Sequence, residues 1–104
     1  MRFEVRFTEP AKRDLDRLFE YLLERAETIE DLDAAQLVIH DLSNAITHQL
    51  ARTPFSFRKA GRSSLRRELI VPSGKTGYVA LFDIEPPSTV LVLAIRHQLE
   101  EDYD

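Results

Sequence analysis

The sequence predicts an α+β domain, in which an antiparallel helix hairpin packs on one face of a small, mainly antiparallel four-stranded sheet in the order β-α-α-β-β-β. Three observations predict it: an alternating strand pattern opens the chain, two amphipathic helical patterns follow, and three strand-like segments joined by short turns come last. With 104 residues and 43% apolar content, we expect one domain over residues 1-104.

The first half of the chain carries the first strand and the hairpin. Phe3, Val5 and Phe7 alternate with charged residues, which is typical of a strand with one buried face. Thr8 is a good N-cap, and the apolar stripe that follows predicts a helix to about Glu27. After a polar joint at 28–31, a second amphipathic helix is expected to end before Pro54.

The second half reads as a polar, basic loop over 54–64 and three strands over 65–71, 78–84 and 89–95. The last strand is apolar on both sides, so we expect it to be central in the sheet. Its two rows are Val90, Val92 and Ala94 on one side, and Leu91, Leu93 and Ile95 on the other. If the helices cover one face only, the second row is exposed and marks an interaction surface.

Charge is unevenly distributed along the chain. The net charge is −4, yet the last five residues alone carry four acids, so the body of the domain is neutral. The stretch from Arg52 to Arg67 contains six cations and no acid: Arg52, Arg58, Lys59, Arg62, Arg66 and Arg67. This basic run is either a solvated loop or a contact for an acidic protein partner or nucleic acid.

The composition also bears on compartment and cofactors. The chain has no cysteine, which fits a reducing compartment and argues against a thiolate metal site. Its start lacks the pattern of a signal peptide, and no apolar run is long enough to span a bilayer. We expect a cytoplasmic protein that needs no metal or cofactor and does not contact a membrane.

A candidate site lies where the last strand ends. Arg96, His97 and Tyr103 supply a guanidinium, a titratable ring and a phenol, groups that bind phosphate, move protons or contact a protein partner. The alternative is a frayed polar terminus, with His97 a structural residue and Tyr103 packed beside Leu99.

The order and spacing of several short motifs resemble those of the RelE/ParE superfamily. They are Phe7-Thr8-Glu9-Pro10-Ala11, the proline that closes the second helix in Ala51-Arg52-Thr53-Pro54, then Leu65-Arg66-Arg67-Glu68-Leu69, Gly77-Tyr78 and Ile95-Arg96-His97. The superfamily comprises toxins of bacterial type II toxin–antitoxin systems. The resemblance implies either a RelE-like toxin that cleaves messenger RNA in the ribosome or a ParE-like toxin that poisons DNA gyrase.

The resemblance implies different roles for the basic residues in each case. A ribonuclease would use Arg66, Arg67 and Arg96 for the phosphate, His97 for the proton and Tyr103 for stacking on a base. Val79 and Leu69 stand where active RelE-like members tend to place basic residues, and the acidic tail would repel RNA. We therefore interpret the chain as ParE-like and predict a gyrase inhibitor rather than an enzyme, with an mRNA endoribonuclease as the enzyme alternative.

The prediction is thus a toxin that inhibits growth by binding and poisoning DNA gyrase and that a cognate, ParD-like or similar antitoxin neutralises. The alternatives are a RelE-like ribosome-dependent mRNA endoribonuclease and a non-toxic antitoxin-binding module. Residues predicted to bind the target are Arg58, Lys59, Arg66, Arg67, Arg96 and His97. Residues predicted to bind the antitoxin are Leu22, Val38, Leu42, Leu91 and Leu93.

Overall fold

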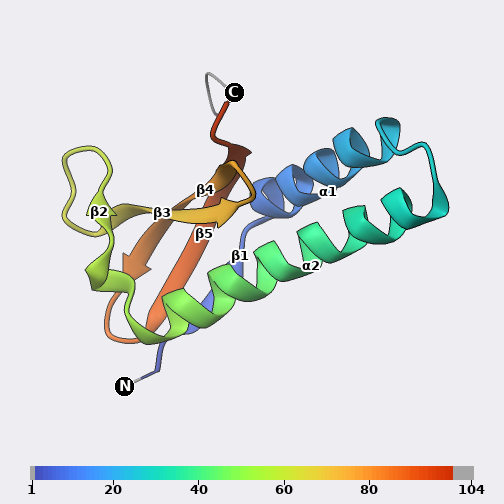
Figure 1. Ribbon diagram of the computed structural model, residues 1–104. Coiled ribbons are helices and arrows are strands. Elements are labelled where there is room, and N and C mark those ends of the chain that lie inside the picture. The colour runs from blue at the N-terminus through green and yellow to red at the C-terminus, as the bar shows by residue number, and fades with distance from the viewer. Residues whose placement is uncertain (1, 100–104) are drawn as a thin grey trace.

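The computed structural model describes residues 2–99 and has two helices on one face of a five-stranded sheet (Figure 1). The elements follow the chain as β1 (Glu4–Phe7), α1 (Glu9–Glu24), α2 (Ile29–Arg52), a 3₁₀ turn (Pro54–Ser56), β2 (Arg58–Lys59), β3 (Arg66–Ser73), β4 (Thr76–Glu85) and β5 (Thr89–His97). The α+β class, the hairpin and the mainly antiparallel sheet are as predicted.

The strand order is β1-β5-β4-β3-β2, with β1 parallel to β5 and every other neighbouring pair antiparallel. The last strand has a neighbour on each side, as its two apolar rows indicated. The predicted count of four strands was wrong by one, because Arg58 and Lys59 in the basic loop pair with the start of β3. This strand covers part of an edge that would otherwise be open.

The helix boundaries reflect local capping. Thr8 accepts a hydrogen bond from the Ala11 amide at 3.3 Å and begins α1 as predicted. Thr28 accepts one from the Asp31 amide at 3.0 Å and begins α2 at Ile29, inside the segment predicted to be a joint. The first helix accordingly ends at Glu24, earlier than the predicted Glu27.

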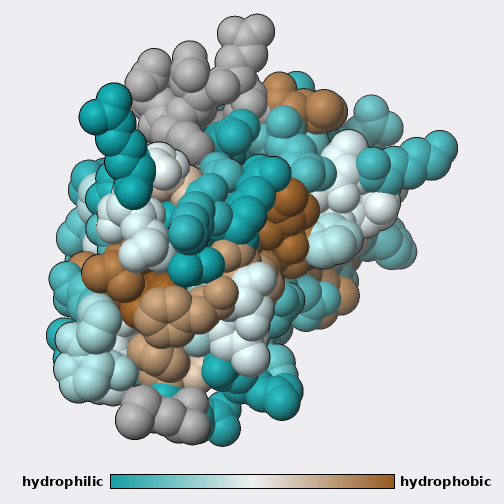
Figure 2. Space-filling view, turned by 90° about the vertical axis from the view of Figure 1, so that its left-hand side faces the viewer, coloured by the Kyte–Doolittle hydropathy of each residue, from teal (hydrophilic) through white to brown (hydrophobic). Residues whose placement is uncertain are grey.

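The hydrophobic core fills the space between the helices and the facing side of the sheet. Its largest fully buried side chains include Phe82, Ile46, Leu50 and Leu69. The opposite side of the sheet carries no helix from residues 2–99 (Figure 1), and we call it the open face. Viewed from the β2 side, the molecule has hydrophobic side chains at its surface among hydrophilic ones (Figure 2).

The predicted faces of β5 need a correction. A bulge shifts the register, so that Leu81 pairs with Ala94 and the next residue, Phe82, pairs with Val92. The extra residue reverses the alternation beyond Leu93. Ile95 therefore joins Val90 and Val92 in the core, and Ala94 does not.

Side chains of α1 satisfy the β5 backbone beyond the end of β1. The Ile95 amide donates to Asp14 Oδ2 at 2.8 Å, and Arg17 donates to the Ile95 carbonyl at 3.3 Å. The fully buried Ile95 is thus held to the helix at a point where no strand within residues 2–99 pairs with that edge of β5. These bonds fix the angle between α1 and the end of the sheet.

Candidate functional site

The two arginines at the start of β3 point to opposite faces of the sheet. Successive strand residues alternate, and in the register Arg66 lies opposite Asp83 while Arg67 lies opposite Phe82. Arg66 on the open face donates two hydrogen bonds to the Asp83 carboxylate, at 2.7 and 2.8 Å. The hydrogen bond to Asp83 and its negative charge raise the pKa of Arg66 above its ordinary value.

Arg67 is a structural clamp for the loop before β3. Its guanidinium donates to the carbonyl oxygens of Ser64 at 2.9 Å, Phe55 at 3.0 Å and Phe57 at 2.8 Å. The same group lies 5.4 Å from the centre of the Phe55 ring. Three of its five N–H donors therefore bond to carbonyls of this chain, which gives Arg67 a structural role in holding the loop.

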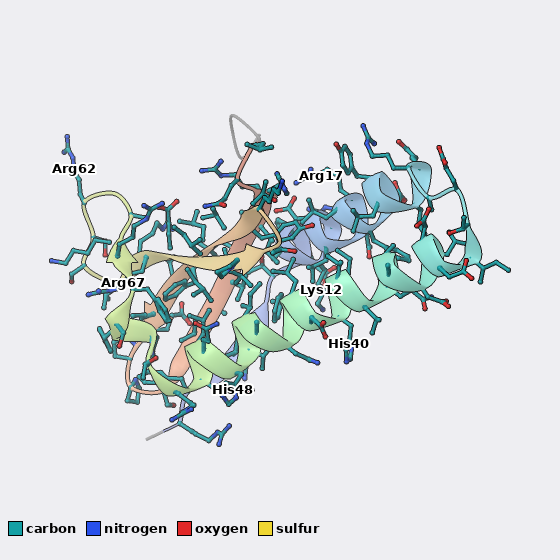
Figure 3. All side chains as sticks on the ribbon, in the orientation of Figure 1. Lys12, Arg17, His40, His48, Arg62 and Arg67 are labelled. Atoms are coloured by element: carbon teal, nitrogen blue, oxygen red, sulfur yellow. The ribbon has the colours of Figure 1, made fainter. Side chains whose placement is uncertain are left out.

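Only part of the basic run remains without a carboxylate partner within residues 2–99. Arg58 forms an ion pair with Glu68 at 3.1 Å, and Arg66 forms one with Asp83. Lys59 and Arg62 are exposed, and Arg62 projects away from the body of the domain (Figure 3). Folding thus brings acids from β3 and β4 to a segment that has none in its own sequence.

His97 is held by its neighbours at the end of β5. Its Nδ1 accepts a hydrogen bond from the Leu99 amide at 3.2 Å, so the neutral ring carries its proton on Nε2, which donates to Thr76 Oγ1 at 2.9 Å. The ring also meets Tyr78 edge to face, with centroids 5.2 Å apart. Arg96 points to the other side of the sheet, opposite Val79.

The residues predicted for ribonuclease chemistry are therefore not brought to one place. Arg66 and Arg96 share the open face, but their partners Asp83 and Val79 are four residues apart on β4, about 13 Å along the strand. Arg67 and His97 lie on the helix side of the sheet, at its opposite ends. Tyr103 lies outside the described residues.

A groove forms instead where the hairpin overhangs the sheet. Three adjoining hollows of about 250, 240 and 260 Å³ share lining residues. Tyr78 joins the first to the second, Val38 the second to the third, and Leu22 the third to the first. We call this ring of hollows the overhang groove, and its lining is mostly apolar, with Leu18, Tyr21 and Leu99 along one side.

The residues predicted to bind an antitoxin fall on two surfaces. Leu22 and Val38 line the overhang groove and are half-buried, whereas Leu42 contributes to its wall from the core with 3% exposure. Leu91 and Leu93 of β5 lie half-buried on the open face of the sheet. The sequence prediction thus mixed two separate surfaces.

Sequence reasoning missed Tyr78 as the centre of the groove, and it missed the overhang. The lengths of the elements indicate the overhang, because the 24 residues of α2 span about 36 Å, whereas the nine residues of β5 span about 30 Å. In Figure 1 the linked ends of α1 and α2 project past the sheet. The position of Tyr78 depends on strand register, which the sequence pattern did not define.

Residues 2–99 contain neither a membrane-spanning helix nor a cluster of metal-binding side chains. None of the helices there has an apolar stretch long enough to cross a membrane. No group of three or more histidine, aspartate or glutamate side chains in that range is arranged to hold a metal ion. His40 and His48 are exposed side chains of α2, two turns apart (Figure 3). His40 contacts Asn44, and His48 contacts Arg52.

Comparison with known proteins places the chain in a family. Residues 5–102 match the model of the ParE toxin of the type II toxin–antitoxin system parDE. A solved structure described as the chromosomal ParDE toxin–antitoxin system from P. aeruginosa aligns with a TM-score of 0.69 and 14% identity, covering 91% of this chain and 95% of that one. No curated protein matches the sequence. At that identity the structure supports the fold, and the family match extends over nearly the whole chain, so the chain belongs to the ParE toxins of type II toxin–antitoxin systems.

Proposed function

We propose that this chain inhibits bacterial growth by binding and poisoning DNA gyrase, and that a cognate antitoxin of the ParD type neutralises it. Membership of the ParE family supports the toxin role. The observation that carries the gyrase assignment is the dispersal of the ribonuclease set. Arg66 and Arg67 are on opposite faces, Arg66 is paired with a carboxylate, and both ring nitrogens of His97 are engaged.

The test is a supercoiling assay with purified gyrase and purified toxin. We expect wild-type protein to inhibit supercoiling and the His97→Ala variant, if it folds, to inhibit as well, because the proposal gives His97 no chemical role. Messenger RNA from cells expressing the toxin should remain intact. Unaffected supercoiling would refute the proposal, and cut messenger would then favour the RelE-like alternative.

The overhang groove is the surface proposed for the antitoxin. It is concave, mostly apolar and formed by both helices and the end of the sheet, which suits the apolar face of an amphipathic helix. The three hollows, which are joined through Tyr78, Val38 and Leu22, can each receive a side chain of one bound segment. A bound segment would cover Tyr21 and Leu99, which are 52% and 76% exposed.

Paired variants separate the groove from the open face. We expect Leu22→Gln with Val38→Gln to weaken binding of the protein encoded by the neighbouring antitoxin reading frame by at least about tenfold, since two apolar contacts are lost. Leu91→Gln with Leu93→Gln makes the same chemical change on β5 and should bind as wild type does. The opposite ranking in a titration of folded variants would assign the antitoxin to the open face.

A further inference from the structure

The overhanging end of the hairpin, residues 20–37, has the composition of a docking surface. It carries four of the seven large hydrophobic side chains that are exposed in residues 2–99: Tyr21, Ile29, Leu32 and Leu37, with exposures of 52, 74, 43 and 60%. None of the four belongs to the core cluster. These four side chains therefore do not contribute to the hydrophobic core of the domain.

The charge of the same segment is strongly one-sided. It contains six acids and a single cation, Arg25, and the acids are Glu20, Glu24, Glu27, Glu30, Asp31 and Asp33. Ion pairs within residues 2–99 neutralise acids of the sheet and of the first turns of α1, but none of these six. Arg25 itself lies over the Tyr21 ring, 3.6 Å from its centre.

We propose that this acidic, apolar hairpin end is the surface by which the protein docks on its target, and that it meets a positively charged surface with an apolar centre. The inference rests on the proposed function. An enzyme that works on DNA must present cationic surfaces to phosphate, and such a surface is the electrostatic complement of six carboxylates that form no ion pair within residues 2–99. The exposed apolar side chains supply the contact area, and the carboxylates supply orientation and on-rate.

This assignment replaces the basic residues predicted to contact the target. Arg58 and Arg66 are already paired with carboxylates, and Arg67 holds three carbonyl oxygens of its own loop. The proposed docking surface also explains how a bound antitoxin could neutralise the toxin. One hollow of the overhang groove is lined by Arg25, Ala26, Asp31 and Ala34 of the hairpin end, so a segment in the groove covers part of the docking surface.

The experiment compares two double variants, each of which neutralises two carboxylates, in the gyrase supercoiling assay. Glu27→Gln with Glu30→Gln changes the hairpin end, and Asp16→Asn with Glu85→Gln makes the same change in net charge at exposed sites elsewhere. We expect the hairpin pair to need at least about fivefold more protein for half-inhibition, and the control pair to match wild type. Raising the salt concentration should weaken wild type more than the hairpin pair.

A second variant tests the apolar part, because Ile29→Ser with Leu32→Ser removes two exposed side chains and leaves the charge intact. It should fold as wild type does by circular dichroism and inhibit at least about tenfold less well. Inhibition by wild type and by both hairpin variants alike would overturn this inference and leave the proposed function standing. A wild-type protein without effect on gyrase would remove both.

Discussion

Arg67 offers the sharpest test of how the structure assigns roles to the basic residues. The Arg67→Met variant keeps most of the aliphatic stem and removes the guanidinium, so the three carbonyl oxygens of Ser64, Phe55 and Phe57 lose their donor. The bond to Phe57 is partly buried and is worth about 1.5 kcal/mol, because its donor is charged. The two exposed bonds contribute about 0.5 kcal/mol each, and the Phe55 ring contact about 0.5 kcal/mol.

The expected loss is therefore about 3 kcal/mol in the free energy of unfolding, which corresponds to a fall of roughly 12 °C in Tm for a domain of this size. Thermal and urea unfolding followed by circular dichroism measure it. The matched control is Arg62→Met, since Arg62 is exposed on the same loop and should change stability by less than about 0.5 kcal/mol. Equal Tm values for both variants and wild type would refute the clamp.

Three further predictions concern the fold that positions the groove, each measured by urea unfolding. Asp14→Ala leaves the Ile95 amide without its acceptor and should cost about 2 kcal/mol, whereas Asp14→Asn, which keeps an acceptor oxygen, should cost less; equal losses would contradict the role of the bond. Gly77→Ala would place a Cβ 2.8 Å from the Val71 carbonyl oxygen, so we expect a loss of about 1–3 kcal/mol, and an unchanged midpoint would show that the strands yield freely. Phe82→Ala empties the centre of the core, with an expected loss of about 4 kcal/mol; a loss below about 1 kcal/mol would mean that this site collapses without a cavity.

Local patterns in the sequence were sufficient to predict most of the elements. The period-two alternation of β1, the Thr8 cap and the helical stripes of the hairpin depend on residues close together in the chain, so they predict structure without knowledge of contacts. The family resemblance also rested on short motifs and their spacing, and the family match confirms it. The apolar composition of the last strand predicted a central position, and β5 does lie inside the sheet between β1 and β4, although its row of Leu91 and Leu93 is on the open face and only half-buried.

The tertiary structure alone decided which side chains act together. The bulge in β5 moves Ile95 into the core, and strand register sends Arg66 and Arg67 to opposite faces. Arg58 and Arg66 of the basic run pair with Glu68 and Asp83 only because β2, β3 and β4 align in the sheet. The sequence thus determined the family and the elements, which depend on local order, whereas the groove and the pairing of charges depend on distances between residues far apart in the chain.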